Sequence, residues 1–314
     1  MHPRNILFIN PPNFDQLAVK YERLRKVCKL NKKGKFQVNF QESESTKILT
    51  EVLLHEYFSL NVSFNKDHLI PRINGRLDYL LIIEDFIKQN FKCHENVLGI
   101  DIGVGANCIY PLLGVKEMKW NFIGIDIDDV AIEEGKKIVK DNNLTSKITL
   151  IKTSENEKNN IYEEALKYLE QNNNIIFSMS NPPFFEESEV NKKFINIKNG
   201  ERTKINGALS SRKTPSSTTI AKDNELYTTG GEVDFIKNMI ENSKNASHKI
   251  SLFTSLIGKK TSITSIEDKL KSIDECQYKF YQMIHGKTSR WIVMWTFNKS
   301  YIFPTENCRK RKIK

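Results

Sequence analysis

The stretch Val97-Leu98-Gly99-Ile100-Asp101-Ile102-Gly103-Val104-Gly105-Ala106-Asn107 carries the clearest signal for the fold. A mainly apolar run of strand length leads directly into a turn that contains two glycines. Glycine lets the backbone turn tightly and approach a ligand closely, and a helix that follows such a turn offers unpaired N–H groups. The pattern predicts a strand, a turn that binds a nucleotide-like ligand, and a helix. Cys108 stands where the dinucleotide fingerprint G-x-G-x-x-G has its third glycine, which argues against NAD and FAD.

The next apolar run, Asn121 to Ile127, carries a carboxylate near its end at Asp126. A carboxylate beside the glycine turn can accept hydrogen bonds from two ribose hydroxyls, and it suits the ribose of S-adenosylmethionine. Acids also cap helices, and we expect Asp128 or Asp129 to cap the helix expected over Val130 to Asn142.

Strand-like and helix-like segments continue to alternate, at Ile148 to Lys152, Asn160 to Glu170 and Ile175 to Met179. Such alternation predicts an α/β fold with a parallel sheet and helices on both faces. Further strands are expected at Ile250 to Phe253, Tyr278 to Met283 and Trp291 to Phe297, with a helix through Phe235 and Ile240.

The tetrapeptide Asn181-Pro182-Pro183-Phe184 follows the fourth of these strands. An exocyclic amine on a nucleobase is a poor nucleophile because its lone pair is delocalised into the ring, so it must be held and aimed. The Asn181 side-chain oxygen and the Pro182 carbonyl can accept its two hydrogens at fixed positions. Phe184 offers a face for a base that is flipped out of its stack. An ordinary turn with two prolines is the alternative.

Ligands of parallel sheets bind beyond the carboxyl ends of the strands, so Gly103, Asp126 and Asn181 should meet at one edge. Three motifs at one edge indicate a class I, Rossmann-like methyltransferase sheet that uses S-adenosylmethionine. Residues from Thr153 to Asn156 would then lie near the adenine of the cofactor.

The chain has 314 residues and a formal net charge of +10, and its length suits one large α/β core with an added module. Its five cysteines form no C-x-x-C pair, so we expect neither disulfides nor a metal site. No apolar run reaches the length of a membrane span, and no signal peptide is evident, which predicts a soluble intracellular protein. The six histidines form no catalytic constellation, and His285 is expected in a surface turn.

Positive charge is concentrated near the N-terminus, where nine Lys and Arg oppose two acids between Met1 and Lys35. We expect residues 1–75 to form a basic, mainly helical module that binds nucleic acid, through residues that include Lys20, Arg23, Arg25 and Lys26. A solvated helix face is the alternative. Aromatic residues among these charges can stack on bases or anchor the module: Phe14, Tyr21, Phe36 and Phe40.

Residues 76–304 are then the methyltransferase domain, and within it the polar segment 186–227 is expected to be a mobile loop beside the substrate. Residues 305–314 form a basic tail that suits either a nuclear localisation signal or an RNA contact, with a frayed terminus as the alternative.

Several longer stretches resemble one family. They are His2 to Asn5, Pro11 to Phe14, Arg76 to Tyr79, Gly99 to Gly114, Asn181 to Phe185, Gly230 to Glu232, Gly258 to Lys260 and Arg290-Trp291. Together they resemble the eukaryotic methyltransferase-like sixteen family of RNA adenine-N6 methyltransferases, which is related to bacterial enzymes that methylate one adenine of 23S ribosomal RNA.

The resemblance implies methylation at N6 of one adenosine in a structured hairpin of U6 small nuclear RNA, in the nucleus, with S-adenosylhomocysteine as product and no metal. It implies that Arg76 steadies the carboxylate end of the cofactor and that Arg4 contacts RNA. The cofactor-binding residues are then expected to be Arg76, Asp101, Gly103, Gly105, Asn107, Asp126 and Asn181, and the catalytic residues Asn181, Pro182, Pro183 and Phe184. Asp126 replaces the Glu of animal members, so the carboxylate would reach the ribose after a small shift.

Three alternatives stay open. A ribosomal RNA adenine methyltransferase differs only in the RNA that it modifies. A methyltransferase of protein glutamine usually has Asn-Pro-Pro-Tyr, so Phe184 and the basic N-terminus weigh against it. A non-catalytic RNA-binding protein on the same scaffold is disfavoured by the intact glycine turn and tetrapeptide. No obligate protein partner and no membrane association are implied.

Overall fold

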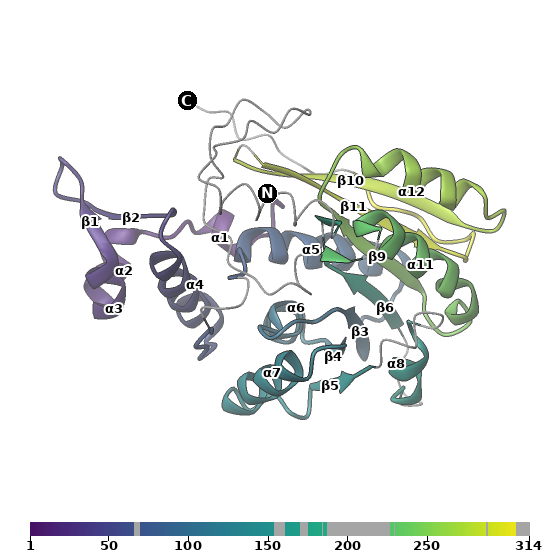
Figure 1. Cartoon of the computed structure of the whole chain (residues 1–314), viewed down its shortest axis with the longest axis horizontal. Helices are drawn as coiled ribbons and strands as arrows, with labels where there is room; N and C mark the ends of the chain where they lie inside the picture. The colour runs from purple at the N-terminus through teal and green to yellow at the C-terminus, as the bar shows by residue number, and fades with distance from the viewer. Residues whose placement is uncertain are drawn as a thin grey trace, which may run out of the picture.

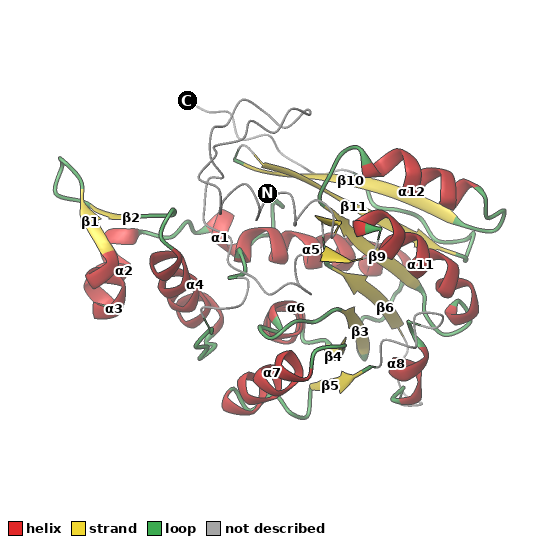
Figure 2. Cartoon of the chain, in the orientation of Figure 1, coloured by secondary structure: helices red, strands yellow, loops and turns green. Residues whose placement is uncertain are grey.

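A seven-stranded sheet forms the centre of the molecule (Figures 1 and 2). The computed structural model describes residues 1–65, 70–153, 161–169, 175–183, 230–286 and 288–305, and the backbone alone of residues 185–186 and 227–228. The order of the strands is β10-β11-β9-β6-β3-β4-β5, and β11 alone runs antiparallel to the other six strands. The strands are β3 (Val97–Ile102), β4 (Asn121–Asp126), β5 (Ile148–Lys152), β6 (Ile175–Ser180), β9 (Leu252–Ile257), β10 (Gln277–His285) and β11 (Thr288–Thr296).

Helices cover both faces of this sheet, because successive residues of each strand point to opposite faces. Val97 of β3 joins one apolar cluster with α5, α6 and α7, while Leu98 joins a second cluster with α8, α11 and α12. The elements are α5 (Ile73–Asn90), α6 (Ile109–Leu113), the π-helical turn η1 (Gly114–Met118), α7 (Asp129–Asp141), α8 (Glu163–Lys167), α11 (Gly231–Ala246) and α12 (Ser262–Lys271). The α/β fold with helices on both faces is therefore confirmed.

The N-terminal segment has a small core of its own, which lies at one end of the molecule (Figure 1). Its elements are α1 (Ile6–Ile9), α2 (Phe14–Lys20), α3 (Glu22–Val27), β1 (Cys28–Leu30), β2 (Phe36–Val38) and α4 (Ser43–Phe58). Leu17 of α2, Leu24 of α3, Val38 of β2 and Leu49 of α4 are buried together. The β1–β2 hairpin was not expected in a mainly helical module. Its turn depends on Asn31, whose side-chain oxygen accepts from the backbone N–H groups of Lys33 and Lys35.

Several element boundaries differ from the sequence-based expectations. The strands at Val97 to Ile102 and Ile148 to Lys152 have the expected bounds, whereas β9 begins two residues late and continues to Ile257. Helix α8 spans only Glu163–Lys167. No helix in the described ranges is long and apolar enough to cross a membrane.

The ends of the expected 186–227 loop are ordered as a short parallel pair of strands, β7 (Phe185–Glu186) and β8 (Tyr227–Thr228). The rest of that loop lies outside the described residues, as do Phe184, Ser154 to Asn156 and residues 306–314 of the basic tail.

Candidate active site

The glycine turn leaves β3 in a tightly fixed conformation. Gly103 and Gly105 have φ angles of 74° and 65°, in the left-handed region that favours glycine. The N–H groups of Gly103 and Val104 donate to the carbonyl oxygen of Ile125 at 2.9 and 3.0 Å, which fixes the turn against the end of β4. A Cβ atom added at either glycine would meet nothing within 4 Å. The turn therefore presents its backbone to open space, as a ligand-binding turn requires. Asn107, half-buried, lies in the same turn.

Asp126 closes the other side of this turn. Its Oδ2 accepts from the Gly105 N–H at 2.8 Å, and its Oδ1 accepts from the Asp128 N–H at 3.0 Å. Burial raises the pKa of the Asp126 carboxyl above its usual range, although these two hydrogen bonds oppose the shift. Each carboxylate oxygen keeps acceptor capacity, which two ribose hydroxyls can use. Asp128 caps α7 by accepting from Val130 and Ala131, so the expected capping role is confirmed for Asp128.

Three polar groups come together behind the turn from three different elements. Asp101 of β3 is buried, and neither of its carboxylate oxygens has a hydrogen-bond partner within the described part of the chain. Burial and the nearby Asp126 raise the pKa of Asp101 to about 8, and the charge of Arg76 opposes this shift. The Arg76 guanidinium carbon of α5 lies 5.5 Å from the centre of the Tyr110 ring of α6. The buried Tyr110 hydroxyl also has no partner among the residues described.

An acid, a guanidinium and a phenol in one place suit a zwitterionic ligand, whose ammonium and carboxylate groups can satisfy them. The methionine end of S-adenosylmethionine has this chemistry. The open glycine turn and these partnerless groups fit that cofactor.

The tetrapeptide begins directly beyond β6. Ser180 lies opposite Ile102 in the parallel pairing of β6 with β3, and its hydroxyl donates to the Ile102 carbonyl at 2.8 Å. The Asn181 side-chain oxygen is buried and has no hydrogen-bond partner in the described ranges. Pro182 is buried and Pro183 is half-buried. Because β3, β4 and β6 are parallel neighbours, the structure brings Gly103, Asp126 and Asn181 to the same edge of the sheet.

The basic residues expected to bind RNA are mostly paired with acids of this chain. Arg4 pairs with Glu84 and Asp85 of α5. Lys20 lies 2.6 Å from Glu56, Arg23 lies 2.9 Å from Glu51, and Lys26 lies 3.1 Å from Glu22.

Arg25 has no such partner within the described residues, and neither do three exposed lysines of the β1–β2 turn, Lys32, Lys33 and Lys35. The cations of this segment that lack an acidic partner in the described residues therefore lie mainly on the β1–β2 hairpin, for which the sequence predicted no specific role.

The prediction that His285 lies in a surface turn was wrong. His285 ends β10, and its Nε2 lies 2.8 Å from a carboxylate oxygen of the buried Asp78. Asn5 donates to the other oxygen of Asp78 at 2.6 Å. This contact between α5, β10 and the N-terminal segment holds the pKa of Asp78 below its usual range, although burial opposes that shift.

Glu232 is a buried acid whose contacts could not be predicted from the sequence. Its carboxylate accepts from the N–H groups of Gly258 and Lys259 at 2.7 and 2.9 Å and from the Ser262 hydroxyl at 2.6 Å. The stretches around Glu232 and Gly258 were visible as motifs, but the contact between them joins residues far apart in the sequence.

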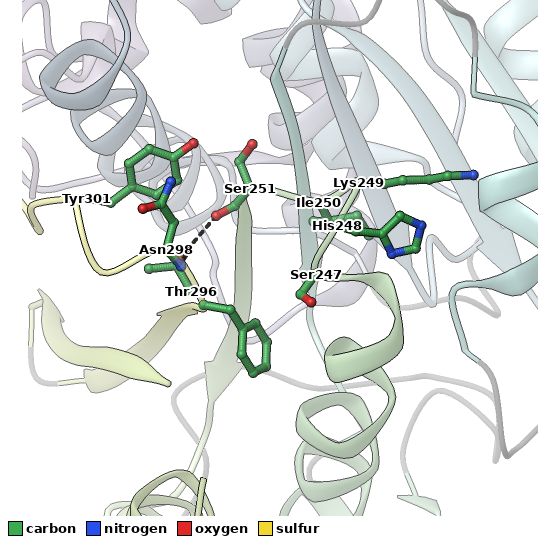
Figure 3. Close-up of a pocket in the computed structure, with 9 residues that line it drawn as sticks. Ser247, His248, Lys249, Ile250, Ser251, Thr296, Asn298 and Tyr301 are labelled. Atoms are coloured by element: carbon green, nitrogen blue, oxygen red, sulfur yellow. Dashed lines mark hydrogen bonds between the residues drawn. The ribbon is translucent and has the colours of Figure 1, made fainter. Parts of the chain in front are cut away.

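A pocket elsewhere contains none of the expected site residues (Figure 3). It is lined by residues that include His248, Lys249, Ser251 and Asn298, around the hydrogen bond from Thr296 to the Ser251 carbonyl. Ser251 precedes β9 and Thr296 ends the antiparallel β11, so this pocket lies at the edge opposite Asn181. No group of His, Cys, Asp and Glu that could hold a metal ion occurs in the described ranges.

Comparisons with known proteins show which family the chain resembles. A family model described as RNA methyltransferase matches residues 1–299. The chain is 35% identical to a U6 small nuclear RNA (adenine-(43)-N(6))-methyltransferase of Caenorhabditis elegans, over 97% of this chain and 64% of the relative. It is 34% identical to the protein of the same name in Drosophila pseudoobscura pseudoobscura, over 98% of this chain and 96% of the relative. The chain thus spans less than two thirds of the worm relative.

Two solved structures are similar throughout. The crystal structure of the hMettl16 catalytic domain in complex with MAT2A 3'UTR hairpin 1 has a TM-score of 0.84 and 30% identity, and the match covers 98% of this chain and 99% of that one. The structure of the N-terminal domain of human METTL16 in complex with SAH has a TM-score of 0.71 and 29% identity, over 95% of this chain and 99% of that one.

Proposed function

The chain belongs to the RNA methyltransferase family whose model it matches, and from this premise we propose that it methylates N6 of a single adenosine in a structured RNA, with U6 small nuclear RNA as the first candidate. The observation that carries this proposal is the buried, partnerless side-chain oxygen of Asn181 at the edge of the sheet that also holds the glycine turn and Asp126. A free acceptor in that place suits an amine hydrogen of the target base.

The cofactor that we propose is S-adenosylmethionine, which supplies an activated methyl group when bound. The backbone of Gly103, Gly105 and Asn107 would face it, and Asp126 would accept from its ribose hydroxyls. Asp101, Arg76 and Tyr110 would hold its ammonium and carboxylate groups, since their polar atoms converge behind the turn.

In the proposed reaction, the adenine amine donates one hydrogen to Asn181 Oδ1 and the other to the Pro182 carbonyl. Both acceptors follow β6, whose end is fixed to β3 by the Ser180 hydrogen bond. The amine nitrogen would therefore face the glycine turn, where the cofactor is proposed to bind. The nitrogen forms a bond to the methyl carbon while the carbon–sulfur bond breaks, and the methylated amine then loses a proton to water. We propose that Phe184 stacks on the extruded base.

The division of the chain is also part of the proposal. Residues 1–75 would bind RNA, residues 76–304 would carry out methyl transfer, and residues 305–314 would add positive charge, with a nuclear location that suits a U6 substrate. The unpaired Arg25 and the hairpin lysines support an RNA-facing surface on the first of these segments.

The test compares labelled methyl transfer from S-adenosylmethionine to a U6 hairpin and to a ribosomal RNA fragment with an unpaired adenosine. We expect transfer to the U6 hairpin. Transfer to the ribosomal fragment alone would show that the substrate is ribosomal RNA and not U6 RNA. Binding of cofactor and RNA without transfer to either RNA would favour the non-catalytic alternative.

A further inference from the structure

Glu232 joins the first turn of α11 to the segment that follows β9, at the edge of the sheet that carries the active site. It lies in the first turn of α11 and is 2% exposed. Its carboxylate accepts two hydrogen bonds from the segment between β9 and α12 and a third from Ser262, the first residue of α12. A buried carboxylate is costly unless it is well paired, and here the partners are two backbone N–H groups and one hydroxyl. These three contacts fix the segment that begins at Gly258.

The same peptide is held from its other side. Arg290 of β11 donates from Nη1 to the Gly258 carbonyl oxygen at 3.3 Å, while Glu232 accepts from the Gly258 N–H. Burial lowers the pKa of Arg290, as do the charges of Arg76 and Arg72, while the charge of Glu232 opposes the shift. The Gly258 peptide is therefore fixed between an acid and a guanidinium, close to the arginine that we assign to the cofactor.

This fixed segment leaves the sheet beside the catalytic tetrapeptide. Strand β9 is parallel to β6 and directly adjacent to it, so Gly258 and Asn181 both follow the carboxyl ends of neighbouring strands. The segment continues into Lys260, which is exposed and whose side-chain ammonium has no hydrogen-bond or ion-pair partner within the described residues. A lysine whose loop is rigid and whose ammonium is free suits a phosphate of a bound nucleic acid.

We propose that Glu232 is a positioning residue, which fixes the Gly258–Lys260 turn so that Lys260 contacts the phosphate backbone of RNA bound at the active site. This inference rests on the proposed function, and it adds a second RNA contact on the side of the site formed by β9. Glu232 touches neither substrate nor cofactor in this account, because its carboxylate is used by the turn itself.

The test is a double-mutant cycle with Glu232→Gln and Lys260→Ala. The first variant keeps the shape of the side chain but presents an amide group where the carboxylate accepts from N–H donors. We expect each variant to raise the KM for hairpin RNA by roughly three- to tenfold and to lower the slope of log affinity against log salt by about 1, with kcat unchanged. The double variant should be no worse than either single one.

Lys249 provides a matched control, since it is an exposed lysine at the other end of β9, in the pocket opposite the active site (Figure 3). Lys249→Ala should leave the KM and the salt slope unchanged. Effects of Glu232→Gln and Lys260→Ala that simply add, or a salt slope that Lys260→Ala leaves unchanged, would overturn the proposal.

Two further readouts keep the test decisive. If Glu232→Gln does not fold, as melting would reveal, Lys260→Glu alone carries the test, and an unchanged RNA affinity contradicts the proposal. Binding and its salt slope are measured without turnover, so a wild-type chain that binds the hairpin but transfers no methyl group refutes the proposed function and still decides this inference.

Discussion

The Ser180 hydroxyl donates to the Ile102 carbonyl at 2.8 Å, and this hydrogen bond joins the residue before Asn181 to the residue before Gly103. The tetrapeptide and the glycine turn are thus fixed to each other by side-chain as well as ladder contacts. Tyr79 adds to the same junction, because its hydroxyl lies 2.7 Å from that of Thr254, which donates to the Ser178 carbonyl. Methyl transfer over a short, fixed distance depends on such rigidity.

Asn181→Ala should lower kcat by roughly 10²- to 10³-fold, because the target amine loses an acceptor placed for it. Equilibrium binding of hairpin RNA should stay as in the wild type. Ser180→Ala, which loosens the junction but keeps the acceptor, should give a smaller loss of kcat. Single-turnover kinetics together with the RNA affinity would check this order, and a parallel loss of RNA binding in Asn181→Ala would contradict the assignment of Asn181 to methyl transfer and not to RNA binding.

Gly105→Ala should weaken binding of S-adenosylhomocysteine, since the new methyl group enters the open space before the turn and the residue has φ of 65°. The left-handed conformation of alanine costs about 1–2 kcal/mol. Gly34→Ala in the β1–β2 hairpin is the matched control, with φ of 72° and equally open space. Both variants should lower Tm, but only Gly105→Ala should change the calorimetric affinity. Equal affinities in the two variants would contradict the placement of the cofactor.

Asp101→Asn should stabilise the cofactor-free chain relative to the wild type, and this gain in stability should increase as the pH rises. The pKa of Asp101 is about 8 in the folded chain, against about 3.9 for an unfolded aspartate. Between these values the unfolded chain releases a proton that the folded chain retains, so the wild type loses stability as the pH increases. The Tm of the variant minus that of the wild type should therefore grow from pH 5 to pH 8. A difference that does not depend on pH would show that Asp101 is ionised throughout.

Arg25→Ala and Arg23→Ala should have different effects, although the two residues share α3. Arg23 pairs with Glu51, which is 4% exposed and also accepts from the Phe64 N–H, so its loss leaves a buried carboxylate with one partner fewer. We expect Arg23→Ala to cost roughly 1–3 kcal/mol of stability. Arg25→Ala should keep the Tm and lower the salt slope of RNA binding by about 1. Melting curves and binding at several salt concentrations would measure both, and reversed effects would refute the assignment.

The central strands were predictable because a buried parallel strand is a continuous apolar run bounded by turn residues, as at Val97 to Ile102. Their shared edge followed from the topology, so the convergence of Gly103, Asp126 and Asn181 followed too. The β1–β2 hairpin could not be predicted, since Phe36 is held by its N–H bond to Asp15, a contact between distant residues. Glu232 was missed for the same reason, because its donors lie 26 to 30 residues further along the chain.

Charge counting was the weakest guide to the RNA-facing surface. The N-terminal excess of positive charge is real, but Arg4, Lys20 and Arg23 are paired with acids from α4 and α5. Tertiary contacts decide which cations remain without an acidic partner. Within the part of the chain that the structure describes, these are Arg25 and the hairpin lysines.

The most direct measurement is nucleoside mass spectrometry of a U6 hairpin incubated with the chain and labelled S-adenosylmethionine, beside the same hairpin with its target adenosine replaced by guanosine. We expect labelled N6-methyladenosine in the first RNA and no label in the second. Label on another atom or another nucleotide, or equal label in both RNAs, would contradict this expectation.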